Sequence, residues 1–411
     1  MKSESESSLK SLKHKNRHLV LECIRQSGAV SMADVARKTG LSKMTIHYIV
    51  EHLLEAGLVI QAGKGESTDE GGKKPKLFAF NSSYRFIFSV RIVEQELLAA
   101  LTNLRGEIIA SHTALYGKDT GLDEILRLVR EAFNSLVRRR KLTPDECLGA
   151  VVGCHGVCDA ERGICLLSPH FTSWGVNVPI RDMVERELPD NIPVFIDNWL
   201  RYLAYGEMKA RTDDVRRFFL MGTEYDGVAG GLVIDGTIYH GDSGLSGEVG
   251  HMVVNPGDEV ECACGGFGCF EVAVSPKRLE EKAWRMRGKR GDSALFRAGS
   301  RREVTFHNIA DAADAGDAFA QSLMDGMAGH FAVAVNNLMH ACDPGLFIIH
   351  GEYAGAGEFF LRRLREKAGA LTLPRMKKNV RIEYSTMDDE CSLTGGACFL
   401  ADNYFANMLR D

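Results

Sequence analysis

The sequence lacks any long uninterrupted apolar stretch, and no run approaches the ~20 apolar residues that a helix needs to cross a bilayer. The residues from Met1 to Glu6 are polar and acidic, which is unlike a signal peptide. Beyond the Ser- and Glu-rich first eight residues there is no low-complexity tract, and we find no internal repeat. These absences argue against a membrane-spanning, exported or repetitive protein, and they predict one that resides in the cytoplasm.

Net charge is also scarce: the chain of 411 residues has 50 Lys and Arg against 55 Asp and Glu, a balance of −5. The charge is unevenly distributed, because residues 1–80 hold 13 basic against nine acidic side chains while the remainder holds 37 against 46. A basic head on an acidic body is expected where only the head contacts a polyanion. The 45% hydrophobic and 26% charged residues exclude a disordered, collagenous or coiled-coil chain and indicate two or three globular domains.

Cysteine occurs in an odd number, 11, without an export signal, which indicates a reducing compartment rather than a disulfide framework. Three cysteines lie within eight residues, and the glycines between them let the backbone fold back so that the thiolates converge. With one imidazole they complete a Cys3His set, the tetrahedral arrangement that structural zinc prefers. We therefore expect one structural Zn2+ per chain, held by His251, Cys262, Cys264 and Cys269. The alternative is a glycine-rich loop with three unrelated thiols.

Residues 1–81 are expected to form a winged helix-turn-helix domain. Apolar residues at helical spacing and capping residues at Ser31 and Ser42 mark three helices, with a tight turn at Gly40. Two strand-like segments then flank a polar, lysine-containing loop. The predicted elements are helices over 9–27, 32–38 and 43–56 and strands over 58–60 and 77–80.

This head suits DNA binding. Two short helices around a glycine turn fit the major groove when the second carries small polar residues on its exposed side, and basic loop residues fit the phosphates beside it. The alternative is a three-helix packing module with a solvated charged hairpin. The candidate DNA contacts are Ser42, Lys43, Thr45 and Tyr48 on the third helix and Lys73 and Lys74 in the loop.

From residue 82 onward, strand-like runs alternate with helical stretches, which predicts an α/β body with helices on the faces of a layered sheet. Residues 311–340 read as one long helix that ends at the turn Asp343-Pro344-Gly345 before another strand, 346–350. The eight cysteines outside the Cys3His set, one of them in the head, are expected to be small buried hydrophobes.

The motifs of the body resemble the ROK family of bacterial sugar kinases and sugar-responsive repressors. The resemblance covers nearly the whole chain, and the head is typical of the repressor branch. Its most specific motifs are Glu-x-Gly-His and Cys-x-Cys-Gly-x-x-Gly-Cys-x-Glu, present here as Glu248, Gly250, His251, Cys262, Cys264, Gly265, Gly268, Cys269 and Glu271.

The resemblance implies an actin-like, two-lobed, ribonuclease-H-like sugar-kinase body that holds a sugar between its lobes and forms homodimers or tetramers. Residues 82–204 with about 388–411 would form the first lobe. Residues 205–387 would form the second lobe, with the zinc knuckle and a dimerisation surface. The remaining sequence departs from the kinases of the family at three places.

In those kinases an Asn-Asp-x-Asn motif supplies the Asp that deprotonates the sugar, whereas here the motif reads Asn198-Trp199-Leu200-Arg201, and an indole cannot accept the proton. The phosphate-binding Asp-x-Gly-Gly-Thr is replaced by residues 91–95, with Glu94 where a glycine would approach phosphate. His350-Gly351-Glu352 stands where the kinases tend to have a Gly-Gly pair. We therefore expect no kinase activity and no catalytic residue.

The sugar-binding residues are only partly retained. The resemblance assigns sugar contacts to Asn198, Glu248, His251 and Glu271, while His170 replaces an Asn of the family pattern. Trp199 also enters this predicted site. Its indole could stack on a pyranose ring, or it could fill the pocket and abolish sugar binding.

The sequence thus predicts a DNA-binding repressor of a carbohydrate operon, which answers to a sugar or sugar phosphate. One alternative is an ATP-dependent hexose kinase that carries a DNA-binding head. The other is a regulator whose cleft is plugged and which answers to a protein partner.

Overall fold

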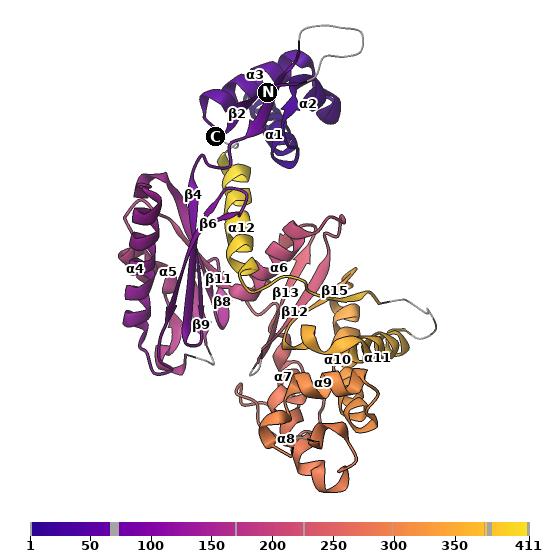
Figure 1. The fold of residues 1–411 in the computed structure, drawn as a ribbon. Coiled ribbons are helices and arrows are strands. Elements are labelled where there is room, and N and C mark those ends of the chain that lie inside the picture. Colours follow the sequence, from indigo (N-terminus) through magenta and orange to yellow (C-terminus); the bar gives the residue numbers. More distant parts are fainter. Residues whose placement is uncertain are drawn as a thin grey trace.

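The computed structural model describes residues 2–408 except 66–73, 169–170, 225–226, 298, 374 and 376–379. A small head lies at one end of the molecule, and two α/β lobes lie side by side below it (Figure 1). The last helix of the chain runs from the space between the lobes toward the head. No helix within the described ranges is long and apolar enough to cross a membrane.

The head has the predicted winged arrangement of three helices and a small sheet. Ser31 and Asp34 form a capping box at the start of the second helix, which ends at Gly40 with φ 71°. The side chain of Ser42 caps the third helix by accepting from the Thr45 N–H. The elements are α1 (Lys2–Gln26), α2 (Met32–Thr39), α3 (Lys43–Glu55) and a sheet of order β1-β3-β2 from β1 (Val30–Ser31), β2 (Val59–Lys64) and β3 (Lys76–Phe80).

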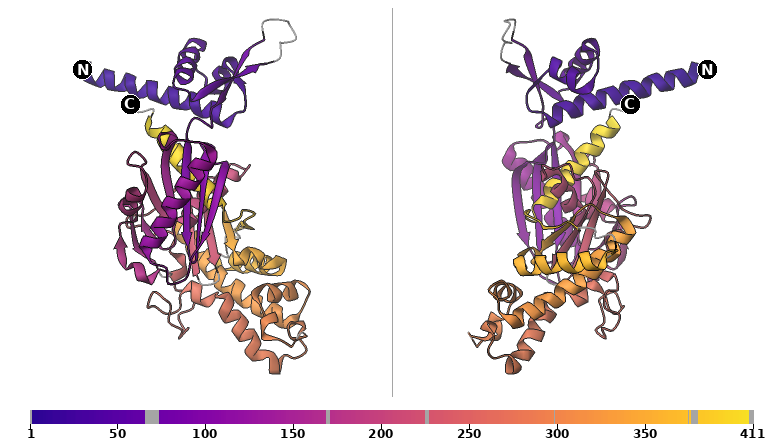
Figure 2. Two further views of the ribbon diagram at one scale, coloured as in Figure 1. Left: turned by 60° about the vertical axis from the view of Figure 1, so that its left-hand side comes forward. Right: turned by 90° about the vertical axis from the view of Figure 1, so that its right-hand side faces the viewer.

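The first helix is longer than the sequence pattern predicts, and its N-terminal half projects away from the rest of the molecule (Figure 2). The loop residue Lys73, a predicted DNA contact, lies outside the described residues, whereas Lys74 is described and exposed.

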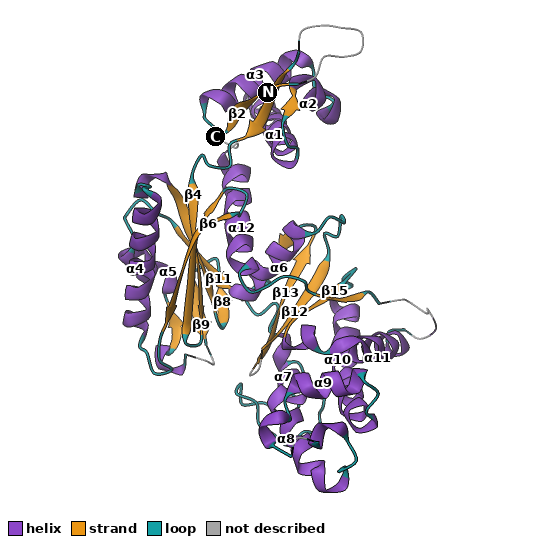
Figure 3. Cartoon of the chain, in the orientation of Figure 1, coloured by secondary structure: helices purple, strands orange, loops and turns teal. Residues whose placement is uncertain are grey.

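The first lobe is built on a five-stranded mixed sheet of order β11-β7-β4-β5-β6. Two helices cover one face, as the cartoon shows (Figure 3), and the buried strand residues pack against them. A three-stranded sheet of order β10-β9-β8 adjoins it. The elements are β4 (Phe86–Val93), β5 (Glu96–Asn103), β6 (Ile108–Leu115), α4 (Leu122–Arg140), β7 (Cys147–Cys154), β8 (Val157–Asp159), β9 (Ile164–Leu167), β10 (Val176–Val178), α5 (Ile180–Glu187) and β11 (Val194–Asn198).

The second lobe contains another five-stranded sheet, of order β14-β13-β12-β15-β16. One face packs on the helix that follows β11, and the other packs on the long helices of this lobe. The elements are α6 (Trp199–Ala210), β12 (Phe218–Glu224), β13 (Gly227–Ile234), β14 (Thr237–Ile238), α7 (Phe270–Ala273), α8 (Pro276–Met286), α9 (Phe306–Asp314), α10 (Ala318–Cys342), β15 (Phe347–Gly351), α11 (Gly357–Leu371), β16 (Ile382–Tyr384) and finally α12 (Cys391–Met408).

The prediction of one long helix over 311–340 is wrong, because the chain breaks between α9 and α10. Gly316 has φ 91°, a left-handed conformation that interrupts a helix. Asp317 then caps α10 by accepting from the Ala320 N–H at 2.8 Å. Its other carboxylate oxygen accepts from Ser293, so a contact distant in sequence also fixes the break.

The head and the body share one hydrophobic cluster. Residues of α1 and β3 pack with residues of α6 and α12, and the rings of Phe80 and Phe405 meet edge to face at 5.7 Å between centroids. The head therefore rests on the last helix of the chain rather than hanging from a linker. The shared cluster includes Val20, Ile24 and Phe80 from the head and Tyr205, Leu400 and Phe405 from the body.

Candidate functional site

The structure brings the four predicted zinc ligands together. Their ligand atoms all lie within 4.8 Å of one another. The Sγ atoms of Cys264 and Cys269 are 3.7 Å apart, and Cys262 Sγ lies 3.5 Å from His251 Nδ1. A tetrahedral zinc with ordinary bond lengths, about 2.3 Å to sulfur and about 2.0–2.1 Å to nitrogen, requires edges of about 3.8 Å and 3.6 Å. The residues therefore fit Zn2+, which would lock the loop when bound.

Glycine makes this convergence possible at two positions. A Cβ on Gly250 would lie 2.0 Å from the Val228 carbonyl oxygen, so only glycine lets the segment with His251 pack against β13. Gly268 has φ 75°, and a Cβ there would lie 2.5 Å from the Asn255 carbonyl oxygen. The backbone then enters α7, which carries Glu271.

A small cavity of about 50 Å³ adjoins the knuckle, at the junction of the two lobes. Four of the six predicted sugar-binding residues line it, namely Asn198, Glu248, His251 and Glu271. The fifth, His170, lies outside the described residues. The sixth, Trp199, is not among the residues that line this cavity.

Asn198 is fixed by hydrogen bonds, and Glu248 is partly buried. Asn198 caps α6, since its Oδ1 accepts from the Leu200 N–H at 2.9 Å, and its Nδ2 donates to the Gly156 carbonyl at 2.8 Å. Burial raises the pKa of Glu248 above its ordinary value, although the charges of Arg201 and His251 oppose that shift. Such a partly buried, hydrogen-bonding set of amide, carboxylates and imidazole suits a polyhydroxylated ligand.

Trp199 is a core residue in this structure. Its side chain is 1% exposed and packs with residues of α6, β12, β13 and β15. The guanidinium of Arg91 lies 5.2 Å from the indole centroid, and the ring of His350 meets it edge-on at 6.4 Å. Trp199 therefore faces the neighbouring large cavity rather than the small one.

That large cavity, about 460 Å³, gathers all three of the sequence departures from the kinase pattern. One guanidinium, that of Arg91, lines it together with four carboxylates, those of Glu94, Glu224, Glu352 and Asp389. Carboxylates therefore outnumber guanidinium and ammonium groups in the lining by four to one. This is an unfavourable environment for a nucleotide triphosphate, which carries several negative charges.

An ion-pair chain among residues that line this cavity runs from one lobe to the other. Asp389, at the start of α12, lies 2.6 Å from Arg91 of β4 and 2.9 Å from His350 of β15. The hydrogen bond from His350 and the charge of Arg91 lower the pKa of Asp389 to about 2. Residues far apart in sequence thus tie the two sheets together.

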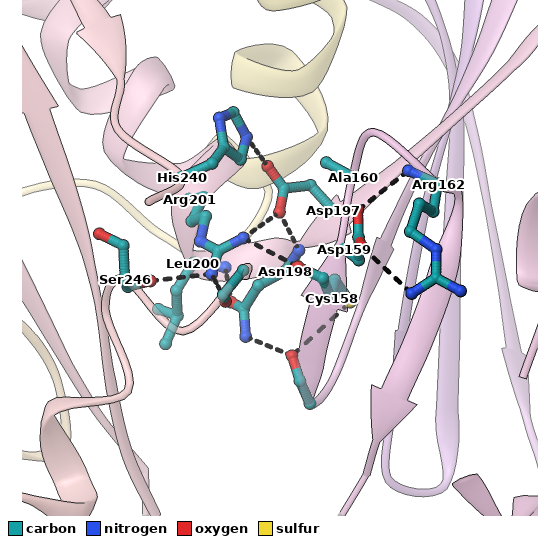
Figure 4. A network of polar contacts seen from close by, with 12 residues as sticks. Cys158, Asp159, Ala160, Arg162, Asp197, Asn198, Leu200, Arg201, His240 and Ser246 are labelled. Carbon is teal, nitrogen blue, oxygen red and sulfur yellow. Dashed lines mark hydrogen bonds and ion pairs between the residues drawn. The ribbon is translucent and has the colours of Figure 1, made fainter. Parts of the chain in front are cut away.

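A second ion pair, which is buried, joins the end of β11 to α6. Arg201 and Asp197 are each 1% exposed and lie 2.7 Å apart, and Figure 4 shows the partners that surround them. The guanidinium also donates to carbonyl oxygens on both sides of the cleft, and His240 lies 2.7 Å from the second Asp197 oxygen. Both oxygens of Asp197 and both terminal nitrogens of Arg201 have partners, which offsets the cost of burying this ion pair. The carbonyl partners are those of Cys158, Gly244 and Ser246.

The predicted DNA contacts on α3 differ in availability. Lys43 and Tyr48 are exposed, the latter by 65%. Ser42 and Thr45 are partly engaged in capping, since their hydroxyls lie 2.8 Å apart. Met44, on the same helix, is also exposed, by 77%.

Other residues of the cleft were also missed. His155 and Glu224 line both cavities and approach each other to 3.5 Å across the lobes. A polar residue that follows a strand is the signal that could have found each of them. No local sequence pattern indicates a role for Asp389, because its partners lie on strands that are far from it in the sequence.

These features define a sugar-kinase-type body of two α/β lobes joined to a winged helix-turn-helix head. The chain belongs to the ROK family, whose profile matches residues 87–403. A profile described as winged helix-turn-helix DNA-binding matches residues 13–60.

Individual relatives include both repressors and kinases. The chain is 28% identical to a xylose repressor of Caldicellulosiruptor bescii over 93% of its own length and 94% of that protein. It is 28% identical to a glucokinase of Halalkalibacterium halodurans over 76% of its own length and 94% of that protein. A crystal structure of a ROK family transcriptional regulator, described as a homologue of the E. coli MLC protein, superposes with a TM-score of 0.80 at 21% identity. That likeness covers 97% of this chain and 98% of the other, and it shows the fold.

Proposed function

We propose that this chain is a sugar-responsive DNA-binding repressor without kinase activity. The observation that carries the proposal is that the sequence aligns with that of a xylose repressor over 93% of its length, including the head. The alignment with a glucokinase relative covers only 76% of the chain. The partners of the protein are then operator DNA and a sugar or sugar phosphate. A cytoplasmic homodimer or tetramer would place two heads on a pseudo-palindromic site.

The effector site of this proposal is the small cavity with Asn198, Glu248, His251 and Glu271. Its 50 Å³ is well below the ~300–1,000 Å³ typical of small-molecule sites, so a sugar would enter only when the lobes separate. A sugar that binds the open arrangement better than the closed one shifts the population toward it. Xylose is the first sugar to test, in view of the repressor relative.

Three features support the absence of kinase activity. The position of the kinase base is Trp199, whose indole takes no proton. The large cavity presents four carboxylates to any nucleotide phosphate. Arg91 is held by Asp389 and Glu96 instead of being available to a phosphate. In this proposal zinc is structural and the knuckle shapes the effector site.

We further infer that α6 and α12 carry the signal from the cavity to the head. Asn198 begins α6, so a sugar bound to Asn198 acts on that helix directly. At the other end of α6, Tyr205 and Lys209 bond to Asp402 of α12 at 2.5 Å and 2.6 Å. Asp402 also lies 2.6 Å from Arg25 of α1 in the head. The helix α6 and the polar contacts of Asp402 thus connect the cavity to α1 of the head.

The test is DNA binding by the zinc-loaded full-length protein, measured by fluorescence anisotropy with DNA from its own genomic neighbourhood. We expect binding that weakens with salt and changes with one sugar of a panel of pentoses, hexoses and their phosphates. The double variant Lys43→Ala/Tyr48→Ala should lose at least tenfold in affinity. Lys277→Ala, an exposed lysine of α8 at the opposite end of the molecule from the head (Figure 1), should bind as the wild type does.

Two results would contradict the proposal. One is the absence of DNA binding at low salt with and without every sugar. The other is ADP release with a hexose and ATP, which would favour the kinase alternative. DNA binding that ignores all sugars would retain the DNA-binding function and favour a plugged cleft that answers to a protein.

A further inference from the structure

A separate cavity lies in the second lobe, outside the cleft. It measures about 190 Å³ and is lined by α8, α10 and the loop that precedes the first cysteine of the knuckle. None of its lining residues belongs to the small or the large cavity. We call it the α8 cavity, and its polar lining residues are Asn255, Asp258, Arg278, Lys282, Arg285 and His330.

The charge of the α8 cavity is strongly asymmetric. Arg278, Lys282 and Arg285 follow one another at spacings of four and three residues, so they share one face of α8. Asp258 is the only carboxylate among the lining residues, and it pairs with Arg278 at 2.7 Å and 3.1 Å. Two cationic side chains therefore remain in excess.

These two cations have no acidic partner in the described part of the chain. No carboxylate there lies within ion-pair distance of Lys282 or Arg285, and the nearest bond of Arg285 is a long one, 3.4 Å, to the Glu281 carbonyl of its own helix. Opposite them, on α10, burial lowers the pKa of His330 and the positive charge of Lys282 lowers it further. The cavity thus has a positive field with two free donors.

We propose that the α8 cavity is a binding site for a small phosphorylated metabolite. A planar guanidinium and an ammonium on one helix face match a phosphate monoester, which offers several anionic acceptors. The volume admits the phosphate group and a small attached body, whereas a flat basic surface would offer no such enclosure. The site is distinct from the sugar cavity, and nothing in its lining requires a sugar.

The α8 cavity is linked to the effector site through Arg278. This side chain also donates to the Val272 carbonyl at 2.9 Å, and Val272 directly follows Glu271 in α7. Asp258 lies in the loop between His251 and Cys262, so a phosphate that competes for Arg278 would release that loop. If the proposed repressor function holds, this link would make sugar affinity depend on the phosphorylated ligand.

Isothermal titration calorimetry on the zinc-loaded full-length protein tests the site without DNA or sugar response, so its outcome is independent of the repressor proposal. The probes are inorganic phosphate and glucose 6-phosphate, with glucose and with chloride at equal ionic strength as references. We expect heat from the two phosphates alone. Affinity should fall at least about tenfold in Lys282→Ala/Arg285→Ala, since charged hydrogen bonds are lost, and stay unchanged in Lys277→Ala on the same helix.

Equal affinity in the double variant and in the wild type would overturn the proposal, as would no phosphate heat in the wild type. Both substituted side chains are exposed, so the fold should persist, and Lys282→Gln/Arg285→Gln repeats the test with longer side chains. Asp258→Asn provides a test in the opposite direction. It removes the competing carboxylate and should tighten phosphate binding several-fold, and a weakening would contradict the competition for Arg278.

Discussion

The carboxylate of Asp402 lies 2.6 Å from a guanidinium nitrogen of Arg25, 377 residues earlier in the chain. Burial alone would raise the pKa of Asp402, but Lys209 and Arg25 outweigh it and hold that pKa below its ordinary value. Since Arg25 belongs to the head and Lys209 to the body, Asp402 is where the two parts share a charge network. The aromatic rings of Phe80 and Phe405 flank the same guanidinium.

Asp402→Asn should uncouple the head from the effector. The substitution leaves two cations facing a neutral amide, so the polar path from α6 to α1 is weakened while α3 is untouched. We expect DNA affinity within a few-fold of the wild type, and a sugar-induced change in Kd that falls toward one from the roughly 5- to 150-fold range typical of allosteric coupling. Anisotropy with and without sugar measures both. Asp123→Asn, an exposed change on α4, is the matched control, and an undiminished sugar response in Asp402→Asn would rule out this path.

Trp199→Ala should destabilise the protein by about 3–5 kcal/mol, the usual cost of removing a large aromatic side chain from a core. The loss follows from its 1% exposure and its packing with Arg91 and His350. Urea unfolding of the two proteins measures it. Trp199→Phe, which keeps an aromatic ring, should cost less. A Trp199→Ala variant as stable as the wild type would show that the indole is not a core residue in solution.

The ion-pair chain through Asp389 should make stability depend on acid in a defined window. Because its pKa is lowered from the ordinary 3.8 to about 2, its contribution is fully present above pH 4 and is lost as pH falls toward 2. The gap in urea midpoint between wild type and Asp389→Asn should therefore be largest near pH 6 and should close between pH 4 and pH 2. A gap independent of pH would mean that the carboxylate charge is not what stabilises the fold.

Cys264→Ser should weaken zinc binding and desensitise the protein to its effector. The substitution removes one of four ligands, and the loop it holds continues into α7 with Glu271. Zinc content by colorimetric chelation and the sugar response by anisotropy provide the readouts, with Cys342→Ser, a half-buried thiol of α10, as the control. The head should remain folded and bind DNA. An effector response equal to that of the wild type would separate the knuckle from the sugar site.

The sequence predicted best what is local. The caps at Ser31 and Ser42 and the convergence of three cysteines depend on residues within about ten positions of one another, where spacing and glycine placement determine geometry. The same locality explains the failure over 311–340. There the apolar pattern continued across Gly316, but the break depends on Asp317 reaching Ser293 in another segment.

Much of the cleft could not be predicted for the same reason. Arg91, Asp389 and His350 are separated by hundreds or tens of residues, and only the sheet topology brings them to one cavity. Trp199 shows that the position of a residue in a motif does not determine the orientation of its side chain. Its position in the motif was evident, but whether an indole turns toward the sugar or into the core is decided by the space between two sheets. No local sequence pattern indicates how much space the two sheets leave for a side chain.

The shared cluster of head and body also bears on the order of events during synthesis. The head emerges from the ribosome first, yet its α1 and β3 share a hydrophobic cluster with α12, which is translated last. A nascent chain can therefore expose its winged helix-turn-helix head before the helix on which that head rests exists. In the proposed repressor, a product that ends before α12 would carry a head without the helix on which it rests, and without the Asp402 contact to Arg25.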